Sequence, residues 1–120
     1  MKAYKVVLAN RRAGKYYSCC KIYGRVEYIP KKWVTPLPGN GPLCCFKNKQ
    51  LAADFMAEHI ALAAPGREKL VEIWECEIVQ SKDCYAWTGG LKIHVESFPE
   101  GTILADKVKL IKKVSCKHIK

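Results

Sequence analysis

The segment from Pro42 to Gln80 decides the fold, and it reads PLCCFKNKQLAADFMAEHIALAAPGREKLVEIWECEIVQ. Its first part, Leu43–Phe46, is too short for a helix and predicts a buried strand. Residues 48–63 place apolar side chains at spacings of three and four, which predicts one amphipathic helix. Asn48 can accept the free N–H groups of the first turn, and the pair Pro65-Gly66 ends the helix.

The last part of this segment predicts a strand that is apolar on both faces. Alternation gives two sets: Leu70, Trp74, Cys76 and Ile78 on one face, and Val71, Ile73 and Val79 on the other. Because such a strand is covered on both sides, we expect it in the middle of its sheet, with the helix packed on one face.

The rest of the chain predicts strands and turns. The expected strands are Ala3–Leu8, Lys15–Ile22, Arg25–Ile29, Leu91–Val95 and Ile103–Val114. Two segments are expected to be loops: Pro30–Pro42 and Ser81–Gly90. The first strand places Tyr4, Val6 and Leu8 on one face. Residues 1–120 therefore predict a single α+β domain, an antiparallel or mixed sheet of five to seven strands packed on one main helix.

The formal net charge of +10 is unevenly spread along the chain. Residues 1–50 hold 11 Lys and Arg against one Glu, residues 51–100 hold four against nine acidic residues, and residues 101–120 hold six Lys against one Asp. Basic ends suit a polyanion. Since no apolar run approaches the roughly 20 residues that span a bilayer, we expect no membrane partner and a cytoplasmic location.

The seven Cys include two adjacent pairs, Cys19-Cys20 and Cys44-Cys45. Adjacent residues on a strand point to opposite faces, so each pair is expected to be split across the sheet. No C-x-x-C spacing occurs, and His59, His94 and His118 are scattered, so the sequence predicts no metal site. We interpret the thiols as reduced, small buried hydrophobic groups.

Basic residues interleaved with aromatic residues predict a binding surface, because cations attract phosphates and exposed rings stack on bases. The candidate phosphate-binding residues are Arg11, Arg12, Lys15, Arg25, Lys31, Lys32, Lys107 and Lys109, and the candidate stacking residues are Tyr17 and Trp33. An ordinary solvated basic face, with the aromatic rings in the core, is the alternative. We expect a basic hairpin loop at residues 10–15, which contains Arg11, and an outward row of Lys107, Lys109 and Lys113 on the last strand. The binding hypothesis requires the Arg11 hairpin, the Pro30–Pro42 loop with Trp33 and the Lys107 row to converge at one edge of the sheet.

Two further candidate sites have weaker sequence patterns: a glycine-containing loop and a pair of glutamates. The Pro30–Pro42 loop contains Gly39-Asn40-Gly41, whose backbone N–H groups could approach a phosphate, although no phosphate-loop motif is present. Glu75 and Glu77 share a strand face, so they are either an acid–base pair or salt-bridge partners of neighbouring cations. We assign no catalytic residue and expect no cofactor.

The order KAYKVV, GKYYSC, PLCCF, KLVEIWECEI and PEGTILADKVKLIKKV resembles small phage proteins of the Thoeris anti-defence sponge type. That resemblance implies a non-enzymatic, oligomeric protein that binds cyclic ADP-ribose-type or cyclic oligonucleotide signals. The chain also resembles the minimal ADP-ribosyltransferase-like fold, which implies NAD chemistry, with Lys5 where an Arg is expected and Glu75 or Glu77 as the acid.

The leading hypothesis is a non-enzymatic binding protein for a phosphate-rich ligand, namely a nucleotide signal, in phage counter-defence. Three alternatives stay open. The same residues could bind nucleic acid, or the basic face could block a nucleic-acid-handling host protein in the manner of an anti-CRISPR inhibitor. The last alternative is an ADP-ribosyltransferase-like enzyme. The expected partners are a polyanion, a host defence protein and further copies of the chain.

Overall fold

The computed structural model of the protein describes residues 1–10, 12–18, 26–61 and 71–114, with the side chains of residues 59–61 left aside. The described strands are β1 (Lys2–Asn10), β2 (Lys15–Ser18), β3 (Glu27–Tyr28), β4 (Trp33–Val34), β5 (Asn40–Gly41), β6 (Leu43–Phe46), β7 (Val71–Gln80), β8 (Tyr85–Thr88), β9 (Leu91–His94) and β10 (Thr102–Val114). The described helical segments are α1 (Lys49–Phe55), a π-helical continuation (Met56–Ala61) and a 3₁₀ turn (Val95–Ser97).

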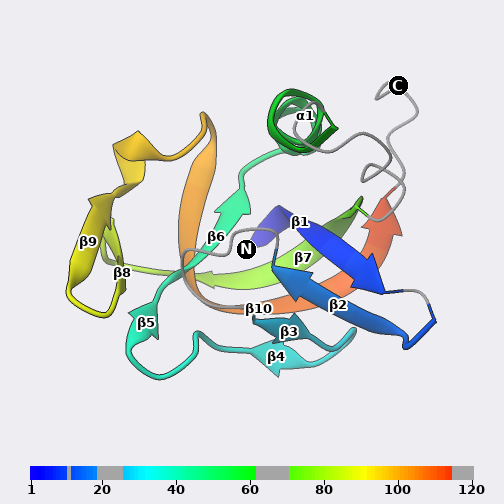
Figure 1. The fold of residues 1–120 in the computed structure, drawn as a ribbon, viewed down its shortest axis with the longest axis horizontal. Coiled ribbons are helices and arrows are strands. Elements are labelled where there is room, and N and C mark those ends of the chain that lie inside the picture. The colour runs from blue at the N-terminus through cyan, green and yellow to red at the C-terminus, as the bar shows by residue number, and fades with distance from the viewer. Residues whose placement is uncertain (11, 19–25, 62–70, 115–120) are drawn as a thin grey trace.

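Seven of the strands form one antiparallel sheet that closes on itself. Strand β1 pairs with both β6 and β7, and β10 also pairs with both β6 and β7, so these four strands make a ring (Figure 1). Strands β2 and β3 extend the sheet from β1, and β4 extends it from β10. The α+β prediction, with up to seven strands packed on one helix, is confirmed.

The predicted central unit has the expected order of elements. The Asn48 side chain accepts a hydrogen bond from the Leu51 N–H at 2.8 Å and so begins helix α1, as the sequence predicts. Strand β7 lies between β1 and β10, which confirms its central position. The proposed last helical turn, at residues 62–63, and the proposed first strand residue, Leu70, lie outside the described residues.

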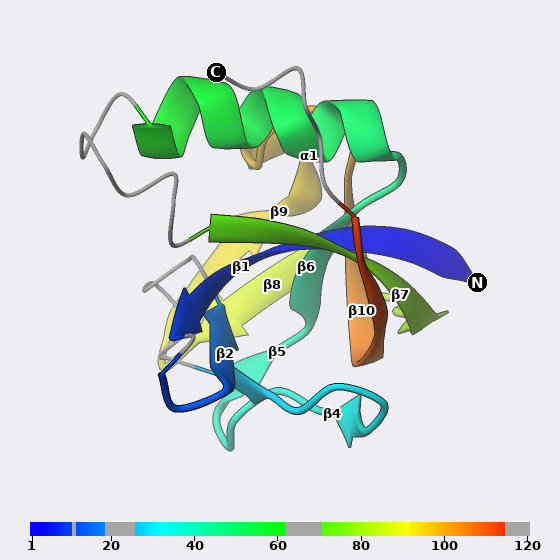
Figure 2. The same cartoon turned by 90° about the vertical axis from the view of Figure 1, so that its right-hand side faces the viewer.

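The two faces of β7 contribute to two separate cores. Trp74, Cys76 and Ile78 point into the ring, where they join inward residues of β1, β6 and β10. Val71 and Ile73 point outward and pack beneath helix α1 (Figure 2). Val79 differs from the expectation: it is an exposed residue near the end of the strand.

Two segments expected to be loops contain short strands, and this part of the prediction is wrong. Within Pro30–Pro42, β4 pairs with β10 and β5 pairs with β8. Within Ser81–Gly90, Tyr85–Thr88 is strand β8, which pairs with β9. Strands β5, β8 and β9 form a small second sheet whose buried contact with the main sheet is Ala86 against Leu104. Two-residue strands have no periodicity, so only their partners reveal them.

The cysteines of the described residues follow the predicted pattern in part. Cys45 and Cys76 are buried inside the ring, whereas Cys44 points to the opposite face of β6 and packs against the small sheet. The adjacent pair is therefore split across the sheet, as expected. Cys84 is exposed, in contrast to the expectation of buried thiols. The thiols of Cys45, Cys76 and Cys84 are free.

Candidate basic and aromatic binding site

Trp33 and two lysines of β10 form a compact group on the outer surface, which we call the Trp33 patch. Strand β4 pairs with β10 so that Trp33 lies opposite Lys109. The Lys109 ammonium lies 4.8 Å from the centroid of the Trp33 ring, and the Lys107 ammonium lies 5.1 Å from it. The Trp33 residue remains 43% exposed. An accessible ring flanked by two cations has the composition of a site for a base and its phosphates.

A tight turn between β3 and β4 holds Trp33 in this place. The Lys32 N–H donates to the Ile29 carbonyl at 3.1 Å, with Pro30 and Lys31 at the centre of the turn. Lys31 has a φ of 69°, a left-handed conformation that costs a side-chain-bearing residue about 1–2 kcal/mol. Its N–H donates to the Leu110 carbonyl at 2.9 Å, which continues the pairing with β10. Lys31 and Lys32 are both exposed beside the Trp33 patch.

The remaining predicted binding residues do not join this patch. Arg12 and Lys15 are exposed at the turn between β1 and β2, which lies to the left of β4 in the lower part of Figure 2. Tyr17 is half-buried on β2, paired with Leu8. The predicted convergence therefore holds for Trp33 with Lys107 and Lys109, whereas Lys113 pairs with Glu72 and the hairpin lies apart. Arg11 and Arg25 lie outside the described residues.

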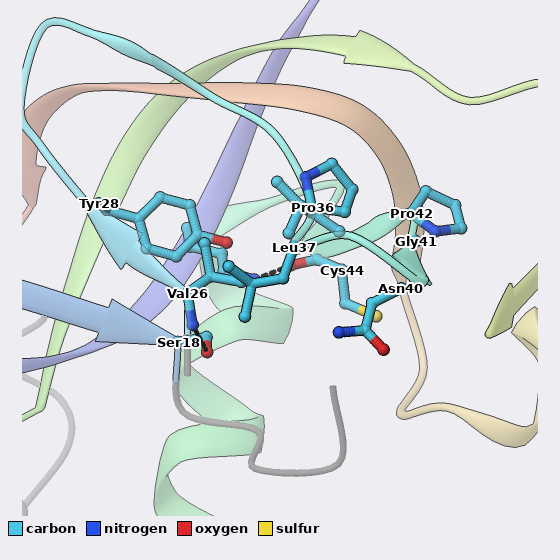
Figure 3. Close-up of a pocket in the computed structure, with 11 residues that line it drawn as sticks. Ser18, Val26, Tyr28, Pro36, Leu37, Asn40, Gly41, Pro42 and Cys44 are labelled. Atoms are coloured by element: carbon cyan, nitrogen blue, oxygen red, sulfur yellow. Dashed lines mark hydrogen bonds between the residues drawn. The ribbon is translucent and has the colours of Figure 1, made fainter. Parts of the chain in front are cut away.

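A buried cation inside the ring was not predicted from the sequence. Lys5 is only 7% exposed, and its ammonium donates a hydrogen bond to the Cys44 carbonyl oxygen. The same ammonium lies 5.3 Å from the centroid of the Tyr28 ring. Tyr28 is 1% exposed, and its hydroxyl has no hydrogen-bond partner among the described residues. Figure 3 shows Tyr28 facing Pro36 and Leu37 across a small cavity.

Burial changes the pKa values of the ionisable side chains inside the ring. It raises the pKa of Tyr28 to about 12, against the opposing effect of the Lys5 ammonium, and it also raises the pKa of the Cys45 thiol. For Lys5, desolvation is the largest effect and lowers the pKa; ionised Tyr28, Cys45 and Cys44 would raise it. Since the phenol and the Cys45 thiol keep their protons at neutral pH, they supply no negative charge to Lys5.

Glu72 is the one glutamate of β7 that points into the ring. Its carboxylate accepts a hydrogen bond from the Trp74 indole N–H at 3.0 Å and pairs with the Lys113 ammonium at 3.5 Å. The side chain is almost completely buried. A buried carboxylate requires such partners, because an unpaired charge is costly in a medium of low dielectric constant. Glu72 and Lys113 therefore form a structural ion pair at one end of the ring.

Glu75 and Glu77 lie on the outer surface of β7, as their shared face predicts. The Glu75 carboxylate pairs with the Lys2 ammonium at 3.2 Å, and this hydrogen bond raises the pKa of Lys2. The Glu77 carboxylate pairs with the N-terminal amine of Met1, also at 3.2 Å. Each carboxylate therefore has its own cation. The geometry favours salt bridges over an acid–base pair.

The described residues contain no group of three or more His, Cys, Asp or Glu that could hold a metal ion. In the same part of the chain, no helix is long and apolar enough to cross a membrane. Comparisons of the whole chain with models of known protein families, with curated proteins and with solved structures found no match.

Proposed function

We propose that this chain is a non-enzymatic binding protein for a phosphate-rich ligand that carries a base. The observation behind the proposal is the Trp33 patch: one partly exposed indole ring with two lysine ammonium groups over it, at 4.8 and 5.1 Å from the ring centroid. A base stacks on the exposed part of the ring, and the adjacent phosphates pair with Lys107 and Lys109. No step of covalent chemistry is part of the proposal.

Among such ligands, the geometry gives more support to a single-stranded oligonucleotide than to a small nucleotide signal. Trp33 lies on a two-residue strand at the outer surface, with Lys31 and Lys32 exposed in the preceding turn. An extended strand can contact these cations together with Lys107 and Lys109. The nucleotide signal in a counter-defence role, implied by the sponge resemblance, is the second candidate.

The test compares binding of labelled oligonucleotides to variants of the patch by fluorescence anisotropy. Because stacking on one ring contributes about 1–3 kcal/mol per base, Trp33→Ala is expected to weaken binding by roughly 5- to 150-fold, and Trp33→Phe by less. Lys107→Ala with Lys109→Ala is expected to reduce the slope of log affinity against log salt by about 1.4, because each phosphate contact to a single strand contributes about 0.7. Lys49→Ala, an exposed lysine of helix α1, is the matched charge control.

Equal binding by Trp33→Ala and the unmodified protein would contradict the stacking role. Binding that does not weaken with salt would contradict the phosphate contacts. Calorimetry with cyclic oligonucleotides and cyclic ADP-ribose isomers tests the second candidate with the same variants, and light scattering tests the proposed homo-oligomer.

The two remaining alternatives receive less support. An inhibitor of a host nucleic-acid-handling protein would use the same basic surface, and a pull-down with and without nuclease separates it from direct nucleic-acid binding. A transferase would need a free acid, whereas Glu75 and Glu77 are each paired with a cation on the outer surface. Labelled NAD with the double variant Glu75→Gln/Glu77→Gln tests that alternative.

A further inference from the structure

The buried residues Lys5 and Tyr28 line a small cavity. Its volume is about 30 Å³, and its lining also includes Pro36 and Leu37 of the loop before β5 and Asn40 of β5 (Figure 3). A water molecule needs about 10–15 Å³ of such space, so the cavity holds two or three waters or one small ion. The loop side opens toward the surface, where Leu37 is exposed.

The residues that line this cavity include two side-chain donors, Lys5 and Tyr28, beside the polar residues Ser18 and Asn40. The Lys5 ammonium has three N–H donors, of which one is directed to the Cys44 carbonyl. The Tyr28 hydroxyl is a further donor with no partner among the described residues. No carboxylate among the described residues forms an ion pair with Lys5. A buried ammonium without a counter-charge is unfavourable, because it has lost most of its hydration and gained no opposite charge.

We propose that this cavity binds one small monovalent anion, of the size of chloride or formate, as the counter-ion of Lys5. The anion accepts hydrogen bonds from the Lys5 ammonium and the Tyr28 hydroxyl, and it neutralises the buried charge. A water molecule would satisfy the hydroxyl but would leave the charge in place. A phosphate group is too large for the cavity, so this site is separate from the Trp33 patch in both place and ligand.

The first experiment measures the melting temperature of the full chain in sodium chloride, formate and gluconate at constant ionic strength. Since only the folded protein has the site, chloride and formate are expected to raise the melting temperature relative to gluconate, which is too large to enter. The melting temperature is expected to rise by about 4–8 °C when the anion concentration is roughly tenfold above the dissociation constant. Lys5→Met, which fills the same space without the charge, is expected to lose this dependence. Lys49→Met is expected to keep it.

A second, direct measurement does not depend on the folding of Lys5→Met. Crystals of the unmodified protein soaked in bromide are expected to show one anomalous peak within hydrogen-bond distance of the Lys5 ammonium, and Tyr28→Phe is expected to reduce its occupancy. The proposal is wrong if chloride stabilises Lys5→Met as much as the unmodified protein. It is equally wrong if no bromide is found in the cavity, or if the nitrogen resonance of Lys5 shows a neutral amine at pH 7 in chloride.

Discussion

Lys5 shows how far a single residue can depart from a prediction based on its type. The alternation of β1 assigns Tyr4, Val6 and Leu8 to a core face, and that assignment is correct, because these residues pack in the cluster beneath helix α1. The opposite face, with Ala3, Lys5 and Val7, is also buried, since the sheet closes around it. Lysines are mostly exposed in folded proteins. Lys5 is buried because the ring, which joins strands far apart in the sequence, closes around it.

Tyr28 makes the stability of the protein sensitive to alkaline pH. Its pKa is about 12 in the folded chain, because burial disfavours the phenolate, against about 10 in an unfolded chain. The folded state therefore holds this proton more tightly. The associated stability is fully present below pH 10 and is lost as the pH rises from 10 to 12, by about 2–3 kcal/mol.

The measurement is urea denaturation of the unmodified protein and of Tyr28→Phe at several values between pH 8 and pH 11.5. Tyr28→Phe is expected to lose less stability over this range, because the phenol that titrates is absent. The buried Cys45 and Cys76 thiols, whose pKa values burial also raises, account for the loss that remains. Tyr85→Phe, which removes an exposed hydroxyl, is the control. The prediction is refuted if the free energy of unfolding falls with pH to the same extent in Tyr28→Phe and in the unmodified protein.

At the scale of elements, helix α1 and strand β10 meet at a point where only glycine fits. Gly101 has a φ of 82°, and a Cβ added there would lie 2.2 Å from Leu51 Cδ1. We expect Gly101→Ala to lower the free energy of unfolding by about 2–4 kcal/mol, as the sum of backbone strain and overpacking. Denaturation in urea measures this change.

Gly14 provides the matched control for that prediction. It has a similar positive φ of 65°, but a Cβ added there would meet nothing within 4 Å. Gly14→Ala is therefore expected to cost only the backbone strain, about 1–2 kcal/mol. If the two substitutions destabilise the protein equally, the contact between Leu51 and Gly101 has no energetic role.

The elements differ in how well the sequence predicts them. The helix beginning at Asn48 and the long strands β7 and β10 have enough residues for a clear period, and each is found where expected. The Trp33 patch could be predicted only as a list of residues, because its assembly depends on a pairing between β4 and β10 that is separated by about 75 positions in the chain. The cavity beside Lys5 depends on even more strands and had no signal in the sequence.

The whole molecule combines a closed ring with a smaller sheet attached at its side (Figure 1). In the ring, β7 pairs along its length with β1 and β10, and apolar clusters cover its two faces. The small sheet has one two-residue strand, and its main buried residue is Ala86, which packs against Leu104. Since local stability follows the amount of buried apolar contact, the two parts are expected to differ in stability.

Hydrogen exchange measures this difference directly. The amides of β8 and β9 are expected to exchange at least about 100-fold faster than those of β7, because the small sheet can open while the ring stays closed. Ala86→Gly, which removes its buried methyl group, is expected to speed exchange in β8 and β9 more than in β7. If the amides of both sheets are equally protected against exchange, and denaturant changes both exchange rates in the same way, the two sheets unfold together. In that case β5, which joins the small sheet to the loop over the Lys5 cavity, would be part of the same cooperative unit as the ring.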